Sequence, residues 1–350
     1  MLQLENKTPF VAQIAILRDE FAAETIYLAI RATFSWQHTN ISLIEEHDPI
    51  SMADEYYGDP TKSSMRRAAE IHLTKPTSDI VLLGDAWAPN AREVESLLVS
   101  LCVGPVREEV LVTGDRHWGT GILKSRITAP VPFHRMPLRY ERAFGGIHPG
   151  CEAPGESDFE TRNPIGCGFV NPHRWGSFNQ LILPNLEHPA YRFTKPGERL
   201  VPVGFGFIAP SWQPRRSLAG TYDSAWERER APFLPLDYQP AFQNTAHPCL
   251  IAPDYLQGGE PLELVNLSPF PRIRFTLPVC RFDVRAFVAG AGPLRRVIRP
   301  HMYLDTVLLE PSKQQFSLLW CGAVPCDKQA LQVERITAHL TRLETGPVYS

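Results

Sequence analysis

Five carboxylates lie among aromatic residues in the middle of the chain, and such a set could perform acid–base chemistry. The set comprises Glu141, Asp158, Glu160, Asp223 and Glu227. Glycosidic bonds are commonly hydrolysed by two carboxyl groups placed on either side of the bond. Separation along a sequence does not give separation in space, so a carbohydrate-active hydrolase that uses two of these residues is one hypothesis.

Arginines near the same carboxylates support a different interpretation. The carboxylates would then be ion-pair partners, Glu141 of Arg139 or Arg142 and Asp223 of Arg215 or Arg216. Arginine presents a planar fork of donors that suits a carboxylate or a backbone carbonyl, inside the protein or on a partner. This interpretation predicts structural carboxylates.

Metal, nucleotide and serine-nucleophile chemistry have no support in the spacing of residues. The eleven histidines occur singly, without an H-E-x-x-H pattern, and the Gly-rich stretch 204–210 does not follow the spacing of a phosphate-binding loop. No G-x-S-x-G is present. The seven cysteines form no Cys-x-x-Cys pair, so reduced, mostly buried thiols are expected. We therefore predict no metal, no cofactor and no catalytic set.

Three stretches, 136–146, 162–169 and 208–226, combine residues of special backbone geometry with polar anchors. Glycine permits positive φ, and Asn-Pro favours a turn. The stretches either brace one another or display aromatic and arginine side chains to a protein partner, the residue types that dominate binding hot spots. Both roles stay open for Arg139, Tyr140, Glu141, Arg142, Phe144, Gly145, Gly146, Asn163, Pro164, Gly166, Gly168, Phe169, Trp212, Arg215, Arg216, Gly220, Tyr222, Asp223 and Trp226.

Composition describes an ordinary globular protein. The chain has 350 residues, 43% hydrophobic and 21% charged, with a net charge of −3. This charge gives no general attraction to nucleic acid. The N-terminus has an acidic residue and no apolar run after it, which argues against a signal peptide. The chain also has no stretch of about 20 apolar residues, which argues against membrane insertion. We expect a cytoplasmic protein.

The segments that must position the candidate residues have the sequence pattern of short strands. Residues 24–36 and the segments from 79 to 117 carry β-forming side chains in partial alternation, and so does the tail from 272 to 345. Periodicity leaves residues 92–104 as a strand or a short helix, and the last segment of the tail as a strand or a terminal helix. Antiparallel pairing fits the pattern.

The middle of the chain differs in its proline content. Of the 33 prolines, 21 lie between Pro130 and Pro271, yet aromatic residues are frequent there too. Aromatic residues argue against disorder, so we expect an ordered irregular excursion. One helix is predicted in it, from Thr221 to Arg230, with Thr221 as the cap and Tyr222 and Trp226 on one face.

These patterns together predict the fold class and its organisation. We expect a mainly β protein with an antiparallel, sandwich-like core, a long irregular excursion rich in proline, glycine and aromatic residues, and one or two short helices. The whole chain, 1–350, is predicted to be a single domain with an N-terminal β block (1–117), the excursion (118–271) and a C-terminal β block (272–350).

Four segments in the same order also carry a family resemblance. "MPLRYERAFGG", "RNPIGCGF", "APSWQPRRSLAGTYDSAWERERAPFLPLDY" and "LQGGEPLELVNLSP" are similar to the hallmark segments of the bacterial family catalogued as domain of unknown function 2169. The similarity extends from about residue 10 to near the C-terminus. The resemblance brings no catalytic residues to this chain, and the pentapeptide repeats of some relatives are absent from it.

The resemblance implies a function as well as a family. Relatives are similar to accessory proteins encoded beside type VI secretion genes, which load effectors onto a spike. It implies a non-enzymatic adaptor or chaperone that binds a secreted effector or its PAAR-type tip domain, with VgrG as a further partner. A carbohydrate- or small-ligand-binding β module is another alternative, and it predicts a deep aromatic pocket.

Overall fold

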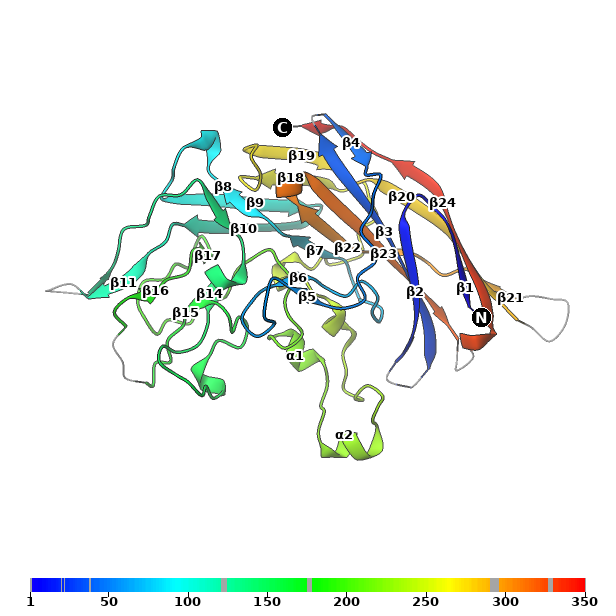
Figure 1. The fold of residues 1–350 in the computed structure, drawn as a ribbon, viewed down its shortest axis with the longest axis horizontal. Coiled ribbons are helices and arrows are strands. Elements are labelled where there is room, and N and C mark those ends of the chain that lie inside the picture. The colour runs from blue at the N-terminus through cyan, green and yellow to red at the C-terminus, as the bar shows by residue number, and fades with distance from the viewer. Residues whose placement is uncertain are drawn as a thin grey trace.

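The computed structural model describes residues 2–19, 21, 23–37, 39–120, 125–174, 178–289, 296–326 and 330–349. The fold is mainly β, with 44% of residues in strands and 10% in helices, which confirms the expected fold class. Three larger sheets make up most of the core, and the proline-rich middle of the chain is arranged beside and below them in Figure 1. No helix in the described ranges is long and apolar enough to cross a bilayer.

The central sheet joins strands from both ends of the chain. Its order is β2 (Val11–Arg18), β3 (Glu24–Gln37), β23 (Gln315–Pro325), β22 (Tyr303–Glu310) and β7 (Asp79–Leu82), with β4 (Asn40–Leu43) also paired to β3. β3 pairs with β23 along most of its length, from Ser35 opposite Gln315 to Thr25 opposite Pro325. The N- and C-terminal blocks therefore share one sheet.

Two further sheets pack against the central one. One contains β1 (Gln3–Lys7), β24 (Val333–Glu344), β20 (Val279–Val288) and β21 (Arg296–Ile298). The other has the order β17 (Leu186–Glu187), β10 (Val106–Thr113), β9 (Ser96–Val103), β18 (Pro261–Val265), β19 (Arg272–Thr276) and β25 (Val348–Tyr349).

Aromatic rings mark the contact between these layers. Phe275 of β19 stacks on Phe316 of β23 with ring centroids 5.0 Å apart, and Phe282 of β20 meets Trp320 of β23 at 5.1 Å. β19 alternates as a half-buried strand should, with Ile273 and Phe275 inside and its other residues exposed. Such interdigitated inner faces are the core of a β-sandwich.

β3 is buried on both faces, which explains its imperfect alternation. Residues such as Ile26 and Phe34 belong to the main core, whereas Tyr27 and Ala29 belong to a second cluster on the opposite face. The second cluster also contains Ile50 and comes partly from the segment between β4 and β7, which holds the short hairpin β5 (Glu55–Tyr56) and β6 (Met65–Arg67). This segment covers the outer face of the central sheet.

Several local predictions can now be decided. Residues 96–103 form a strand, and the last segment of the tail is β24 rather than a terminal helix. Pairing is largely antiparallel, but β1 pairs with β24 and β7 with β22 in parallel, so the expectation of antiparallel pairing is wrong for these two pairs. In the excursion, β14 (Phe144–Gly145) and β15 (Cys167–Gly168) are also parallel. Local alternation does not encode strand direction.

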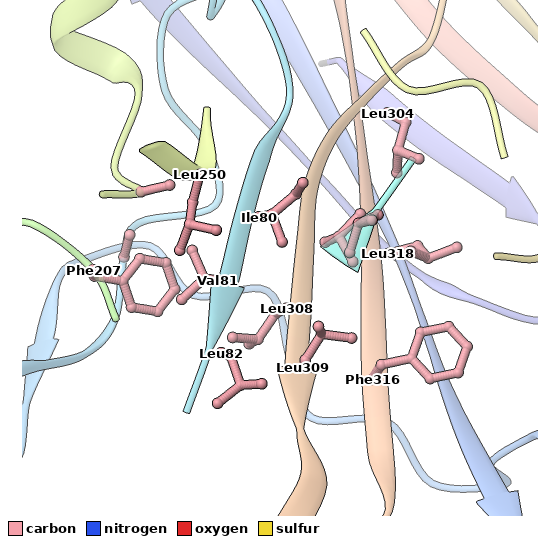
Figure 2. Packing of buried hydrophobic residues seen from close by; sticks show 14 of the residues in the cluster. Ile80, Val81, Leu82, Phe207, Leu250, Leu304, Leu308, Leu309, Phe316 and Leu318 are labelled. Atoms are coloured by element: carbon pink, nitrogen blue, oxygen red, sulfur yellow. The ribbon is translucent and has the colours of Figure 1, made fainter. Parts of the chain in front are cut away.

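The excursion contributes more regular structure than expected. β18 lies within it and pairs with β9 and β19, and β17 forms one edge of the same sheet. Smaller pairings join β11 (His117–Thr120) to β12 (Ser125–Ile127) and β16 (Leu181–Ile182), and β13 (Arg135–Pro137) to β8 (Asp85–Trp87). Figure 2 shows Phe207 and Leu250 of the excursion beside Val81 of β7, and all three side chains are buried.

Two short α-helices lie in the excursion, α1 (Arg215–Leu218) and α2 (Ser224–Glu229), with α2 at the far end of an extension away from the sheets (Figure 1). The predicted helix is confirmed but shorter, and its cap is Asp223, which accepts hydrogen bonds from the backbone of Ala225 and Trp226. Thr221 instead donates to Asp237. The carboxylate of Asp223 accepts from two backbone N–H groups at the start of α2, so Asp223 and not Thr221 is the cap.

The remaining helical turns are single 3-10 turns. Four of them begin with proline, whose fixed φ and missing N–H suit a first helical position. They are η1 (Pro89–Ala91), η2 (Tyr140–Arg142), η3 (Glu156–Asp158), η4 (Pro240–Gln243), η5 (Pro248–Leu250), η6 (Pro311–Lys313) and η7 (Ala330–Gln332).

Candidate functional site

The stretch 140–146 forms a rigid corner against the stretch 162–169. η2 leads into β14, and β14 pairs in parallel with β15, with Phe144 opposite Cys167 and Gly145 opposite Gly168. Phe144 and Phe169 are almost fully buried, so both loops are anchored in the interior. The positive φ that glycine permits is present at Gly145, Gly146 and Gly168.

Asn163 is the brace of this corner. Its side-chain amide, 0% exposed, donates to the backbone carbonyls of Tyr140 at 2.8 Å and Phe144 at 3.0 Å. Gly146 has φ of 89°, and a Cβ there would collide with the carbonyl oxygen of Gly166. The backbones therefore approach too closely for any other residue at position 146.

Tyr140 connects the corner to the third stretch. Its ring meets Trp212 edge-on at 5.5 Å, and its hydroxyl donates to the carbonyl of Gly206 at 3.3 Å. Burial raises the pKa of Tyr140 well above its usual value. Arg215, also buried, donates to the carbonyls of Ile208 at 2.5 Å and Phe242 at 3.0 Å. These residues brace the fold.

The predicted ion pairs of Glu141 and Asp223 are wrong. Glu141 accepts hydrogen bonds from the backbone N–H and the hydroxyl of Ser64, which lies in the segment covering the central sheet. Arg142 pairs instead with Asp115 at 2.9 Å. Backbone donors can satisfy a carboxylate as well as an arginine can, and sequence proximity does not distinguish the two.

Arg215 and Arg216, the predicted partners of Asp223, have other partners. Asp223 caps α2, while Arg216 lies 3.7 Å from Glu156 and is largely exposed. Of the remaining candidate residues, Pro164 follows the brace residue, Gly220 adopts φ of 85°, and Tyr222 meets Trp226 at 4.7 Å on the exposed extension. Tyr222 precedes the cap of α2, so the predicted shared helical face is wrong, although the two rings are in contact.

The five carboxylates considered for hydrolysis point into separate environments. Asp158 accepts from Asn171 at 3.0 Å, Gly155 at 3.1 Å and Arg174 at 2.7 Å, and these bonds, that of Asn171 first, lower its pKa. Glu160 is held by Arg162 at 2.7 Å. Within the described ranges, no two of the five share a hydrogen-bond partner.

An open cleft lies beside the corner. A hollow of about 220 Å³ is lined by residues of the corner, of β8 and β13 and of the covering segment, including Tyr57, Ser64, Arg135, Arg139 and Tyr140. A second hollow of about 480 Å³ shares Tyr57, Leu83, Glu310 and Lys313 with the first, so the two form one cleft. Nine of its twenty lining residues are charged and two, Tyr57 and Tyr140, are aromatic, unlike the lining of a deep aromatic sugar pocket.

Most cations of the cleft are neutralised by a carboxylate. The pairs are Arg66 with Glu55 at 2.9 Å, Arg67 with Asp48 at 3.1 Å, Arg135 with Asp85 at 2.5 Å, and Lys313 with Glu310 at 2.7 Å.

Arg139 differs from these cations. It lies over the ring of Tyr57 at 3.8 Å, and among the described residues it has no carboxylate partner. Its side chain is exposed and Tyr57 is 38% exposed, so the guanidinium can meet a group from outside. Burial raises the pKa of Tyr57, which keeps the ring neutral.

Sequence reasoning selected Arg139 and Glu141 but missed the partners of both residues. Tyr57, under Arg139, and Ser64, which donates to Glu141, lie in the covering segment, and the hydrogen bonds of Ser64 to Glu141 span 77 positions. No spacing or turn pattern connects the two regions.

Comparison with known proteins identifies a family. No curated protein and no solved structure matches the chain. The sequence model described as "Uncharacterized protein conserved in bacteria (DUF2169)" matches residues 22–321. This range includes both the corner and the cleft. The chain therefore belongs to the DUF2169 family of bacterial proteins.

Proposed function

We propose that this protein is a non-enzymatic adaptor-chaperone of type VI secretion. It would bind an effector, or the PAAR-type tip domain of an effector, in the cytoplasm and deliver it to the VgrG spike. The family membership and the resemblance of the four hallmark segments support this role. The observation that carries it is the exposed, unpaired guanidinium of Arg139 on Tyr57.

The corner prepares Arg139 for binding. The residues on its C-terminal side are held by Asn163 and by the buried Tyr140, so the backbone of Arg139 needs little ordering when a partner arrives. Arginine and tyrosine are enriched in binding hot spots, and an arginine fork binds a carboxylate with two parallel hydrogen bonds. An acidic side chain or a chain terminus of the cargo fits this position.

The extension that ends in α2 supplies an apolar contact. Tyr222 and Leu236 are 53% and 71% exposed there. Exposed apolar groups on a chaperone can cover apolar surface on a cargo that would otherwise aggregate. Cleft and extension together give the cargo a polar anchor and an apolar one.

The test is co-expression with the effector encoded next to the gene of this protein. Soluble effector and co-purification are measured for the wild type, for Arg139→Glu and for the control Arg296→Glu, which reverses an exposed arginine on the edge strand β21. We expect Arg139→Glu to reduce co-purification at least about tenfold, the size of a hot-spot loss, with an unchanged melting temperature.

Three results would contradict the proposal. An effector that is equally soluble alone and forms no complex removes the adaptor role. Wild-type binding that survives Arg139→Glu but is lost with Arg296→Glu places the contact elsewhere. Hydrolysis of cell-wall sugar by the wild-type protein would contradict the non-enzymatic part.

A further inference from the structure

A buried polar cluster lies between the central sheet and the segment that covers it. The ammonium of Lys75 is 2.8 Å from Asp305, 3.0 Å from Asp79 and 2.8 Å from the hydroxyl of Thr306. The side chains of Lys75, Asp79 and Asp305 are at most 2% exposed. Burial alone would lower the pKa of Lys75, but the two carboxylates outweigh burial and raise it.

The charges in this cluster do not balance. Asp79 and Asp305 contribute two negative charges, and Lys75 contributes one positive charge. The nearby Arg31 and Glu70 pair with each other at 2.6 Å and cancel. Asp79 accepts further bonds from Asn244 and Thr245, which are neutral. The buried Arg215 also interacts electrostatically with Asp79, while Asp305 faces Lys75 on one side and His72 on the other. Buried carboxylates need such compensation, so the protonation or metal binding of His72 decides the charge balance at Asp305.

His72 points an unused nitrogen at this negative charge. Its Nδ1 lies 2.6 Å from the carbonyl oxygen of Leu73, which can only accept, so Nδ1 carries a proton. In the neutral ring Nε2 then has a lone pair. Nε2 is buried without a hydrogen bond, on a side chain that is 8% exposed, and lies 3.3 Å from Oδ2 of Asp305. Two acceptor atoms that face each other are stabilised by a positive charge between them, which is either a proton on Nε2 or a metal ion.

A β-bulge directs Asp305 into this position. The pairing of β22 with β23 shifts between Leu304 and Thr306, so Asp305 is the extra residue without a partner. Such a bulge re-aims a side chain, and bulges are frequent beside functional sites. Here the bulge places Asp305 near His72 from the covering segment and Cys321 from β23.

The three side chains have the geometry of a metal site. One ligand atom each from His72, Asp305 and Cys321 lies within 4.8 Å of the others. Tetrahedral zinc with bonds of about 2.1 Å to nitrogen and oxygen separates those two atoms by about 3.4 Å, close to the 3.3 Å observed. A cavity of about 30 Å³ lined by the same three residues has room for an ion or a single water.

A second group of the same residue types lacks this property. Glu108, His247 and Cys249 also lie within 4.8 Å of one another. Nε2 of His247 lies 3.1 Å from the carbonyl of Pro202, and Nδ1 accepts from the backbone N–H of Cys249 at 3.3 Å. Both ring nitrogens are occupied, so His247 has no lone pair to offer. The free nitrogen of His72 distinguishes the two groups.

We propose that His72 Nε2, an Asp305 carboxylate oxygen and Cys321 Sγ bind a Zn²⁺ ion, with a water as fourth ligand. Nitrogen, thiolate and carboxylate ligands are the set that zinc prefers. The Cys321 thiol loses its proton to solvent as the Zn–S bond forms, without any redox change. Zn²⁺ and Lys75 then carry three positive charges against the two carboxylates and the thiolate. The ion ties the covering segment to β22 and β23.

The test uses full-length protein stripped of metal with a chelator. Co²⁺ is added as a probe, because a thiolate ligand gives a charge-transfer band in the near ultraviolet and tetrahedral Co²⁺ absorbs strongly in the visible. We expect both bands to saturate at one Co²⁺ per chain and to disappear on addition of Zn²⁺. Cys321→Ser should abolish the charge-transfer band and weaken binding at least tenfold. Cys249→Ser, in the second group, should leave both bands unchanged.

Other results would overturn the proposal. The wild-type protein has no such site if it is folded, shows no saturable Co²⁺ spectrum, and has the same melting temperature with and without Zn²⁺. This measurement requires no variant. In that case nitrogen NMR should show both ring nitrogens of His72 protonated, with the imidazolium as the missing cation. A charge-transfer band lost in Cys249→Ser and kept in Cys321→Ser would assign the metal to the other group.

Discussion

Replacement of Asn163 by alanine tests whether the corner that carries Arg139 is held by one buried amide. The side chain donates to the carbonyls of Tyr140 and Phe144. The Tyr140 carbonyl also accepts from the N–H of Ala143 at 3.1 Å, so it keeps one bond in the variant. Among the described residues the Phe144 carbonyl has no second donor, so its desolvation is uncompensated in the variant.

These contacts set the size of the effect. An unsatisfied buried carbonyl costs about 1–3 kcal/mol, and loss of a second, partly replaced bond costs about 1 kcal/mol. We therefore expect Asn163→Ala to lower the free energy of unfolding by about 2–4 kcal/mol. Asn163→Asp keeps the shape but cannot donate when ionised, so we expect at least the same loss.

The assay is urea unfolding followed by tryptophan fluorescence and by far-ultraviolet circular dichroism, which must coincide for a two-state analysis. Asn40→Ala, at an exposed position of β4, is the control and should change stability by less than about 0.5 kcal/mol. Wild-type stability in both Asn163 variants would refute the reasoning that the amide braces the corner.

Three further predictions concern neighbouring features. Gly146→Ala should lower the free energy of unfolding by about 2 kcal/mol or more, because the added Cβ would collide with the carbonyl oxygen of Gly166. Gly150 has φ of 77° but open space around it, so the control Gly150→Ala should lower that free energy by only about 1 kcal/mol. Urea unfolding of both variants measures the difference. Arg215→Ala removes the donor from the backbone carbonyls of Ile208 and Phe242, so it should lower the melting temperature. The control Arg216→Ala, at the surface, should leave the melting temperature unchanged. A lower melting temperature for Arg216→Ala alone would contradict the bracing role of Arg215. Burial lowers the pKa of His247, so the unfolded chain binds the proton first as pH falls. The free energy of unfolding should therefore decrease below about pH 6.5, and His247→Asn should flatten that dependence; an identical pH profile for the variant would refute it.

Local chemistry in the sequence predicted much of what is local in the fold. Alternation identified β3 and the strands of the tail, and turn chemistry identified the corner at Gly145 and Gly146. A helix near Trp226 was also predicted, although its cap is Asp223 and not Thr221. These features depend on neighbouring residues, because φ preferences, caps and alternating burial are all set within a few positions.

Partners, in contrast, were decided by the tertiary structure. Glu141 is held by Ser64, and Arg139 rests on Tyr57, because the segment covering the central sheet returns to the corner. Strand direction in the parallel pairs depends on the path of the chain between the strands.

The same holds for the buried cluster. His72, Asp305 and Cys321 meet because the covering segment lies over β22 and β23 and a bulge turns one carboxylate inward. Scattered histidines and cysteines predicted no metal, since spacing along the chain records only ligands that are close in sequence. Residue patterns thus predicted many of the strands and turns, and the packing of distant segments decided the remaining strands and which side chains face one another.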